Sequence, residues 1–248
     1  PERLLVPFAI AAASGLVLTY TTTGIFNFAH GAVGMLGAFA YWQLRFGWGW
    51  STPLALVVVL GLLAPLLGVV IERVVMRGLY DAPEPSRVVV SIGLLAALLG
   101  LGLWMWPPDV ARPFPRFWGN ESVSVLGVNV TWHDVISLAT AVGLAVGLRL
   151  LLYRSRPGLA MRAAVDDRPL AMLNGARPHR SSMLAWAIGC TSAAVAGVLV
   201  APTVGLSHVN LTLMIVNAYA AAMIGRLRSL PMTFAGAVLV GLLDAYAL

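Results

Sequence analysis

Lysine is absent from this 248-residue sequence, whose 16 basic residues are all arginine. The absence excludes a Walker A phosphate-binding loop, because the lysine that reaches the phosphates is obligatory there. It also excludes chemistry through a lysine Schiff base. Whatever energy the protein uses, it does not bind ATP through a P-loop of its own.

Cysteine and charge are also scarce. Cys190 is the only cysteine, so an intrachain disulfide is excluded, and its apolar surroundings predict a small packing residue. Charged residues form 10% of the chain and hydrophobic residues 59%. A soluble domain could not bury so much apolar surface. We therefore expect an integral membrane protein, and we assign its net charge of +6 to cytoplasmic loops rather than to a nucleic-acid partner.

Eight apolar stretches approach the length of about 20 residues that a membrane-spanning helix needs. They predict an all-α integral membrane protein with about 8 transmembrane or half-spanning helices in a single domain over residues 1–248. The last two are short and the chain begins at Pro1, so we expect a fragment that lacks a terminal helix. The stretches are Leu4–Thr23, Ile25–Leu44, Pro53–Met76, Val88–Trp106, Val135–Tyr153, Met183–Ala201, Leu211–Ile224 and Met232–Leu248.

A polar break, GIFNFAHG at Gly24–Gly31, separates the first two stretches. Backbone that breaks inside lipid must bury its N–H and C=O groups in protein or against water, so such breaks tend to mark a path or a binding site. Asn27 and His30 either line that path or bond to neighbouring helices, and both interpretations stay open. The sequence suggests no metal site, because His30 has no second ligand at a suitable spacing. The candidate path residues are Asn27, Phe28, His30, Gly31, Asn217 and Tyr219.

Small residues recur at helical spacing in two stretches. Gly31, Gly34 and Gly37 are three apart, and Gly189, Ala193 and Gly197 are four apart. Small residues at such spacing let helices approach closely. They predict tightly packed helices rather than a wide aqueous pore.

The arginines predict the orientation of the chain. With the loop Arg154–Arg180 placed in the cytoplasm, 12 arginines fall at the inner side and 4 at the outer side. Cytoplasmic loops carry an excess of basic residues, so the N-terminus is expected outside. Seven tryptophans would then form a belt at the outer side: Trp42, Trp48, Trp50, Trp104, Trp106, Trp118 and Trp132.

Two loops are long enough to have a role of their own. The outer loop Pro107–Asp134 is rich in proline, and Ser122–Val130 predicts a short hairpin. This loop either contacts an external partner or caps the helices. In Arg154–Arg180, a helix is expected over Leu159–Asp167, followed by a new turn at Pro169 and a helix end at Asn174-Gly175. On these residues alone, that element is either a docking site for a cytoplasmic partner or an amphipathic helix on the lipid surface.

Three segments resemble the permease subunits of branched-chain amino-acid (Liv-type) ABC importers. They are TTTGIFNFAHGAVGMLGAFAYWQL at 21–44, GLAMRAAVDDRPLAMLNGA at 158–176 and LAWAIGCTSAAVAGVLVAPTVGL at 184–206. The first is similar to the family's hallmark segment and the second to its cytoplasmic segment. The third is similar to the small-residue helix that follows. The order of the spans also fits, so the likeness covers nearly the whole chain.

The resemblance implies a transport subunit of the bacterial plasma membrane rather than an enzyme. It implies a second permease subunit, identical or paralogous, two cytoplasmic ATPase subunits and an extracellular solute-binding protein. This chain would hold no cofactor, and the ATPase subunits would bind ATP and Mg²⁺. The solute would be a branched-chain or related amino acid. The segment 158–176 would couple to the ATPases through Gly158, Met161, Arg162, Asp166, Asp167 and Arg168.

One segment departs from the family pattern. Members usually show a Gly-Gly-x-Gly-Ser-x-x-Gly-like turn where this chain has Gly225 to Met232, and Arg226 and Arg228 replace two of the glycines. The close packing or positive φ that glycine allows is therefore in question here. The arginines could instead contact the partner ATPase or anionic lipid.

The alternative function is a stand-alone ion-coupled secondary transporter or channel. Such a protein needs an acid inside the membrane, and Asp244 is the only candidate. Glu72 and Arg73, at the inner end of the third span, suit an interfacial charge pair better than a proton relay. A membrane-embedded enzyme lacks a catalytic constellation in this sequence. A pure assembly scaffold remains a further alternative.

Overall fold

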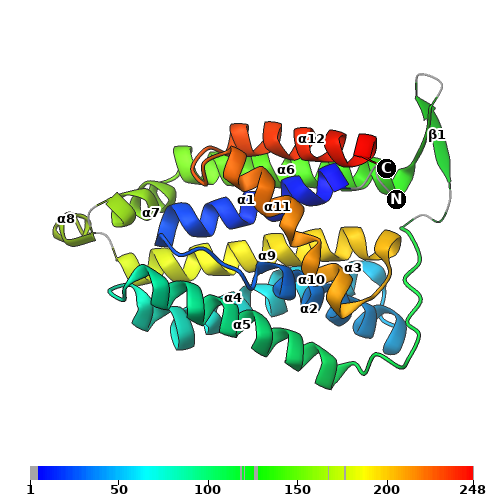
Figure 1. Ribbon diagram of the computed structural model, residues 1–248, viewed down its shortest axis with the longest axis horizontal. Coiled ribbons are helices and arrows are strands. Elements are labelled where there is room, and N and C mark those ends of the chain that lie inside the picture. Colours follow the sequence, from blue (N-terminus) through cyan, green and yellow to red (C-terminus); the bar gives the residue numbers. More distant parts are fainter. Residues whose placement is uncertain are drawn as a thin grey trace.

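The computed structural model describes residues 5–117, 119, 121–125, 128–166, 168–175 and 177–247. Five of its helices are long and apolar enough to cross a membrane, and two shorter apolar helical stretches accompany them. The chain is therefore an all-α, multi-pass membrane protein, as the composition predicts. The helices lie roughly along one axis, and the molecule has two distinct ends (Figure 1).

The long helices follow the expected spans closely. They are α1 (Leu5–Thr23), a nearly continuous helix over Thr52–Leu79 that includes α3 (Thr52–Val58) and α4 (Ala64–Ile71), α5 (Glu84–Met105), α6 (Trp132–Arg154), α9 (Pro178–Val204) and α12 (Leu230–Ala247). Three π-helical turns interrupt the bundle, at Gln43–Gly47, Val59–Leu63 and Glu72–Met76, and Arg77–Leu79 is a 3₁₀ turn.

Two expected spans differ from the prediction. The span expected at Ile25–Leu44 is shorter, because the break extends to Ala29 and α2 covers only His30–Trp42. The span expected at Leu211–Ile224 starts earlier, at His208, and is divided at Met214 into α10 (His208–Leu213) and α11 (Ile215–Ile224). The Ser207 side chain accepts a hydrogen bond from the Asn210 N–H, and this cap explains the earlier start.

Helix α9 lies at the centre of the bundle, with α1, α2 and α4 packed against it (Figure 1). Glycines allow this packing. A Cβ atom on Gly197 would overlap the backbone of Gly34, and one on Gly37 would lie 2.6 Å from the Cβ of Ala194. The predicted close approach of the small-residue helices is thus confirmed. Helices α1 and α9 are mostly buried inside the protein, whereas α5 and α6 expose most of their residues, as lipid-facing helices do.

The two ends of the bundle carry different elements. At one end, α7 (Arg156–Asp166) and α8 (Arg168–Leu173) project beyond the long helices (Figure 1). The predicted helix, its interruption near Pro169 and its end before Gly175 (φ +82°) are confirmed. Asp167 lies outside the described residues.

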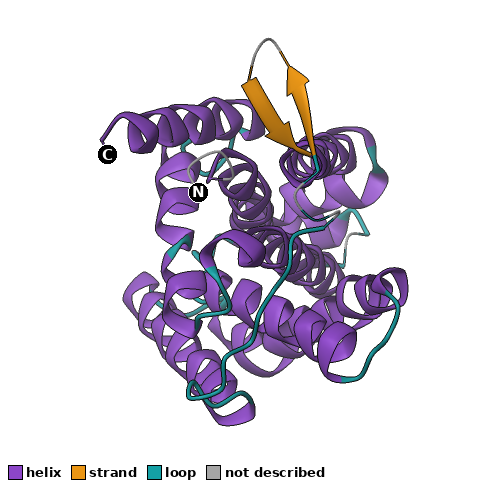
Figure 2. Cartoon of the chain, turned by 90° about the vertical axis from the view of Figure 1, so that its right-hand side faces the viewer, coloured by secondary structure: helices purple, strands orange, loops and turns teal. Residues whose placement is uncertain are grey.

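The other end carries the predicted hairpin, β1 (Ser122–Val125) and β2 (Val128–Thr131), which pair antiparallel. It stands beside the start of α6 when the molecule is viewed from that end (Figure 2). The Thr131 hydroxyl accepts a hydrogen bond from the Asp134 N–H and the Asp134 carboxylate accepts one from the Thr131 N–H, so a capping box begins α6.

The tryptophans follow the belt prediction only in part. Trp104 and Trp48 are strongly exposed, whereas Trp106 is buried. The Trp106 ring packs 5.4 Å from the ring of Phe39, and its indole N–H donates to the Gln43 side chain at 3.1 Å. Its role is therefore packing between α5 and α2. Trp118 lies outside the described residues.

Candidate functional site

The first helix ends in a run of threonines. The hydroxyls of Thr19, Thr21, Thr22 and Thr23 all donate to backbone carbonyls three or four residues earlier in α1. Gly24 then adopts φ +67°, which ends the helix at a position that disfavours any residue with a Cβ. The Ile25 N–H donates back to the Thr23 hydroxyl at 3.2 Å. The break therefore starts from a well-bonded helix end.

A serine of α5 bonds to the backbone of the break. The Ser91 hydroxyl accepts from the Phe28 N–H at 2.8 Å and donates to the Phe26 carbonyl at 3.1 Å. Ser91 is fully buried. One side chain thus satisfies two backbone groups that the end of the helix leaves free. Our sequence analysis did not single out this residue, although a serine among the apolar residues of a span was a visible signal.

A tyrosine of α11 holds the other side of the break. The Tyr219 hydroxyl lies 2.8 Å from the Phe28 carbonyl and 3.3 Å from the Asn27 carbonyl. Its ring packs on Phe26 and Phe28, with centroids 5.0 and 6.1 Å away, and those two rings are 4.7 Å apart. Two of the candidate path residues, Phe28 and Tyr219, are therefore in contact although 191 residues separate them.

The side chains of Asn27 and His30, in and directly after the broken segment, are fully buried. Neither the amide of Asn27 nor the ring nitrogens of His30 make a well-formed hydrogen bond to a described residue. The His30 ring faces the backbone of Ala12 and lies near Gly15 in α1. Buried polar groups are normally hydrogen-bonded, so such a pair needs an explanation. Both residues have unused donors or acceptors next to the broken backbone.

The remaining path candidates have different positions. Gly31 is a packing position, because a Cβ there would overlap the backbone oxygen of Thr212 in α10. Asn217 is half-buried, and its side chain makes no hydrogen bond within the described residues. It is about 200° around the helix from Tyr219 at about 100° per residue. The fold thus brings Asn27, Phe28 and Tyr219 together, turns the His30 ring toward α1 and places Asn217 on another face.

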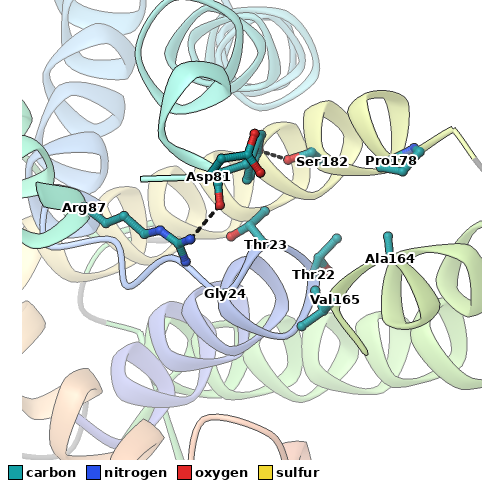
Figure 3. Close-up of a pocket in the computed structure, with 10 residues that line it drawn as sticks. Thr22, Thr23, Gly24, Asp81, Arg87, Ala164, Val165, Pro178 and Ser182 are labelled. Atoms are coloured by element: carbon teal, nitrogen blue, oxygen red, sulfur yellow. Dashed lines mark hydrogen bonds between the residues drawn. The ribbon is translucent and has the colours of Figure 1, made fainter. Parts of the chain in front are cut away.

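The end of α1 faces a polar pocket of about 250 Å³ (Figure 3). Thr22, Thr23 and Gly24 line it from α1, and Arg87 and Ser182 line it from α5 and α9. The Arg87 guanidinium donates to the carbonyls of Leu79, Tyr80 and Ala82, and the Tyr80 hydroxyl bonds to Ser182. These contacts connect the segment before α5 to the start of α9. The pocket is at the end of the bundle that carries α7.

The predicted coupling residues include two that serve packing. Met161 is fully buried, and Gly158 lies tightly against the end of α6, because a Cβ there would overlap the carbonyl of Leu151. Arg162 is half-buried, with its guanidinium carbon 4.5 Å from the centre of the Tyr153 ring. Asp166 ends α7 and Arg168 begins α8.

Three large apolar side chains of α7 and α8 are strongly exposed. Leu159, Met172 and Leu173 are 62%, 59% and 85% exposed. Exposed apolar side chains on a projecting element are typical of an interaction surface. The coupling residues expected from the sequence did not include these three.

In the turn between α11 and α12, two residues other than glycine adopt the left-handed backbone conformation. Arg226 and Leu227 adopt φ values of +52° and +56°. Their N–H groups donate to the carbonyls of Met223 and Ala222 at 2.8 and 2.9 Å. Gly225 remains and packs tightly against Thr233. Of the two arginines that replace glycine, Arg226 therefore keeps a positive φ and Arg228 does not.

Two acidic residues, Glu72 and Asp244, lie within the predicted spans. Glu72 is fully buried and pairs with Arg77 at 3.2 Å, whereas Arg73 is exposed. The π-helical turn Glu72–Met76 explains this partner, because it brings the fifth following residue over the first. Asp244 is half-buried near the end of α12 and makes no ion pair within the described residues.

The model of the family described as "Branched-chain amino acid transport system / permease component" matches residues 3–248. This chain belongs to that family. It is a permease component, and the break and the packed glycines are features of a transport subunit in the membrane.

Individual relatives agree with this assignment. The chain is 30% identical to the high-affinity branched-chain amino acid transport system permease protein LivH of Escherichia coli, over 94% of this chain and 79% of that protein. It is 26% identical to BraD, the corresponding permease protein of Pseudomonas aeruginosa, over 94% and 80%. A probable LivH of Methanocaldococcus jannaschii is 25% identical over 95% and 76%. No solved structure gave a significant match.

Proposed function

We propose that this permease component moves a small amphipathic solute, of the branched-chain amino acid class, through an ATP-binding-cassette importer of the plasma membrane. The observation that carries the proposal is the broken segment after α1. Ser91 and Tyr219 hold its backbone, while the side-chain polar atoms of Asn27 and His30 make no well-formed hydrogen bond to a described residue.

The chemistry around the break suits a solute with one apolar and one polar part. The rings of Phe26, Phe28 and Tyr219 form an apolar surface. Asn27 and His30 provide polar groups next to it. An amino acid with an aliphatic side chain matches this combination, and the relatives are named for such solutes.

The energy would come from other chains. We place the coupling site on α7 and α8, where Leu159, Met172 and Leu173 are exposed at one end of the bundle. Two ATPase subunits that bind this surface more tightly in one conformation would shift the permease toward that conformation, since only a difference in affinity moves an equilibrium. A second permease subunit and an extracellular solute-binding protein complete the proposed assembly.

The proposal fixes an orientation. The α7 end faces the cytoplasm, as the arginine distribution predicts. Because α1 runs toward that end (Figure 1), its start then faces outward together with the hairpin.

Co-purification of the ATPase subunits tests the coupling site and the orientation together. The double variant Leu159→Glu/Leu173→Glu is compared with the control Val110→Glu, which changes an exposed residue in the loop after α5, away from α7. We expect the ATPases to purify with the native chain and the control, and to be lost from the double variant. Equal retention by all three folded proteins would contradict the coupling site.

A further inference from the structure

A second pocket lies at the α7 end of the molecule. It has a volume of about 320 Å³ and is enclosed by the ends of α1 and α6, by α7 and by the turn between α11 and α12. Arg162 contributes from α7 and Arg228 from the turn, and Tyr20 and Tyr153 are also part of the lining. The fold therefore brings two arginines from distant parts of the sequence to one pocket. No acidic residue is among the described residues that line it.

The charge of Arg162 is held in place but not neutralised. Its guanidinium carbon lies 4.5 Å from the centre of the Tyr153 ring, a cation–π contact that orients the group. Its Nε is buried and has no hydrogen-bond partner among the described residues. Neither Arg162 nor Arg228 makes an ion pair within the described part of the chain. Leaving a buried donor unpaired is costly, so the site calls for an anionic acceptor.

We propose that this pocket binds the phosphate group of an anionic lipid from the membrane leaflet at the α7 end. Arginine is suited to this group because its planar fork of N–H donors matches phosphate oxygens. The proposal goes beyond the transport function and does not depend on which solute is moved.

The position of the pocket favours a lipid over free phosphate as the source. Tyr153 and Leu150, at the end of α6, are 50% and 54% exposed on a helix that shows most of its surface to the surroundings. The pocket wall also includes Leu152 and Val165, which are apolar. A headgroup held by the arginines would leave its glycerol and acyl chains beside these residues and the lipid-facing surface of α6. Basic residues at the cytoplasmic surface attract anionic lipids in the same way.

The turn that carries Arg228 offers a matched control. Arg226 is exposed, lies two residues away and is not part of the pocket lining. Arg154 is exposed at the end of α6 and is also outside the lining. The pair Arg154→Gln/Arg226→Gln therefore removes the same net charge from the same end of the molecule as Arg162→Gln/Arg228→Gln, without altering the pocket.

Native mass spectrometry of the detergent-purified chain tests the proposal. The protein is titrated with phosphatidylglycerol and, separately, with phosphatidylcholine, in the presence and absence of inorganic phosphate. We expect preferential binding of phosphatidylglycerol to the native chain and to the control pair. Binding to Arg162→Gln/Arg228→Gln should be about tenfold weaker or more, since this variant loses both charge-assisted hydrogen-bonding groups that would contact the phosphate directly. The single variant Arg228→Gln should show part of this loss, and it covers the case in which the double variant does not fold.

Three results would overturn the proposal. Equal binding of the two lipids would remove the anionic preference. An equal loss of phosphatidylglycerol binding in Arg162→Gln/Arg228→Gln and in the control Arg154→Gln/Arg226→Gln would show that net charge, not the pocket, attracts the lipid. Displacement of the lipid by inorganic phosphate at similar concentration would assign the site to free phosphate instead.

Discussion

At the scale of single residues, Tyr219 contributes in two ways to the break. Its ring packs on Phe26 and Phe28, and its hydroxyl donates to the carbonyls of Phe28 and Asn27. The first contact needs only the ring, whereas the second needs the oxygen. The two contributions can therefore be separated by one substitution.

Tyr219→Phe keeps the ring and removes the donor. We expect it to lower the free energy of unfolding by about 1 kcal/mol, because two buried carbonyls lose a partner in an environment with little water. Thermal unfolding in detergent measures the change. Tyr246→Phe is the control, since Tyr246 is 88% exposed and should tolerate the same change. An equal effect of both substitutions would refute the role of the hydroxyl.

Arg226 has a backbone conformation, with φ +52°, that is unfavourable for a residue with a side chain. An L-residue in the left-handed region costs about 1–2 kcal/mol, and glycine avoids that cost. We expect Arg226→Gly to raise the unfolding temperature, with a net gain of roughly 0.5–1 kcal/mol after the greater flexibility of glycine in the unfolded chain is counted.

Arg228→Gly is the matched comparison in the same turn. Arg228 is not among the residues with positive φ. Glycine there relieves no strain and should lower stability, so a similar gain from both variants would contradict the backbone explanation.

At the scale of elements, close contact between α2 and α9 depends on glycine. Gly197→Ala would place a methyl group into the backbone of Gly34. Because two helix backbones are less easily displaced than a flexible side chain, we expect a loss of about 1–3 kcal/mol, the usual cost of overpacking. The measurement is again unfolding in detergent.

The control for that variant is Gly147→Ala in α6. A Cβ at Gly147 would meet no other atom within 4 Å. Alanine also favours a helix by about 1 kcal/mol over glycine, so this variant should be neutral or more stable. A loss of stability in Gly147→Ala equal to that in Gly197→Ala would show that the effect does not come from helix packing.

The sequence predicted the elements better than their contacts. Hydrophobic length and proline or glycine signals were sufficient for the long helices, the break, the hairpin and the division between α7 and α8. Several helix starts were misplaced: the break extends to Ala29, Ser207 caps α10, and α5 and α9 begin at Glu84 and Pro178, before the expected Val88 and Met183. Such local hydrogen bonds are weakly encoded in hydropathy.

The candidate site could be predicted only in part, because its contacts join residues far apart in the chain. Asn27 and His30 stood out as polar residues in an apolar segment. The roles of Ser91 and Tyr219 depend on which helices lie beside the break, and no periodicity within one helix contains that information. Asn217 was grouped with Tyr219 for a different reason, since the helical spacing that places them on different faces was available in the sequence and was not applied.

At the scale of the whole molecule, the structure separates a buried centre from exposed outer helices. Helices α1 and α9 are mostly enclosed, and the break lies between them and α5 and α11. The projecting α7 packs against both α1 and α9, and α8 contacts α9. A movement of α7 would therefore displace the central helices, and α1 leads directly into the break. This arrangement links the proposed coupling site to the proposed path.

The most direct test of the account is uptake of labelled leucine into proteoliposomes. The vesicles contain this chain with the proposed partners, namely a second permease subunit, two ATPase subunits and a solute-binding protein. The account predicts uptake that requires ATP hydrolysis and that is independent of ion gradients. Uptake that persists without ATP and follows a proton or sodium gradient would contradict it, and would direct attention to Asp244 as an ion-coupling residue.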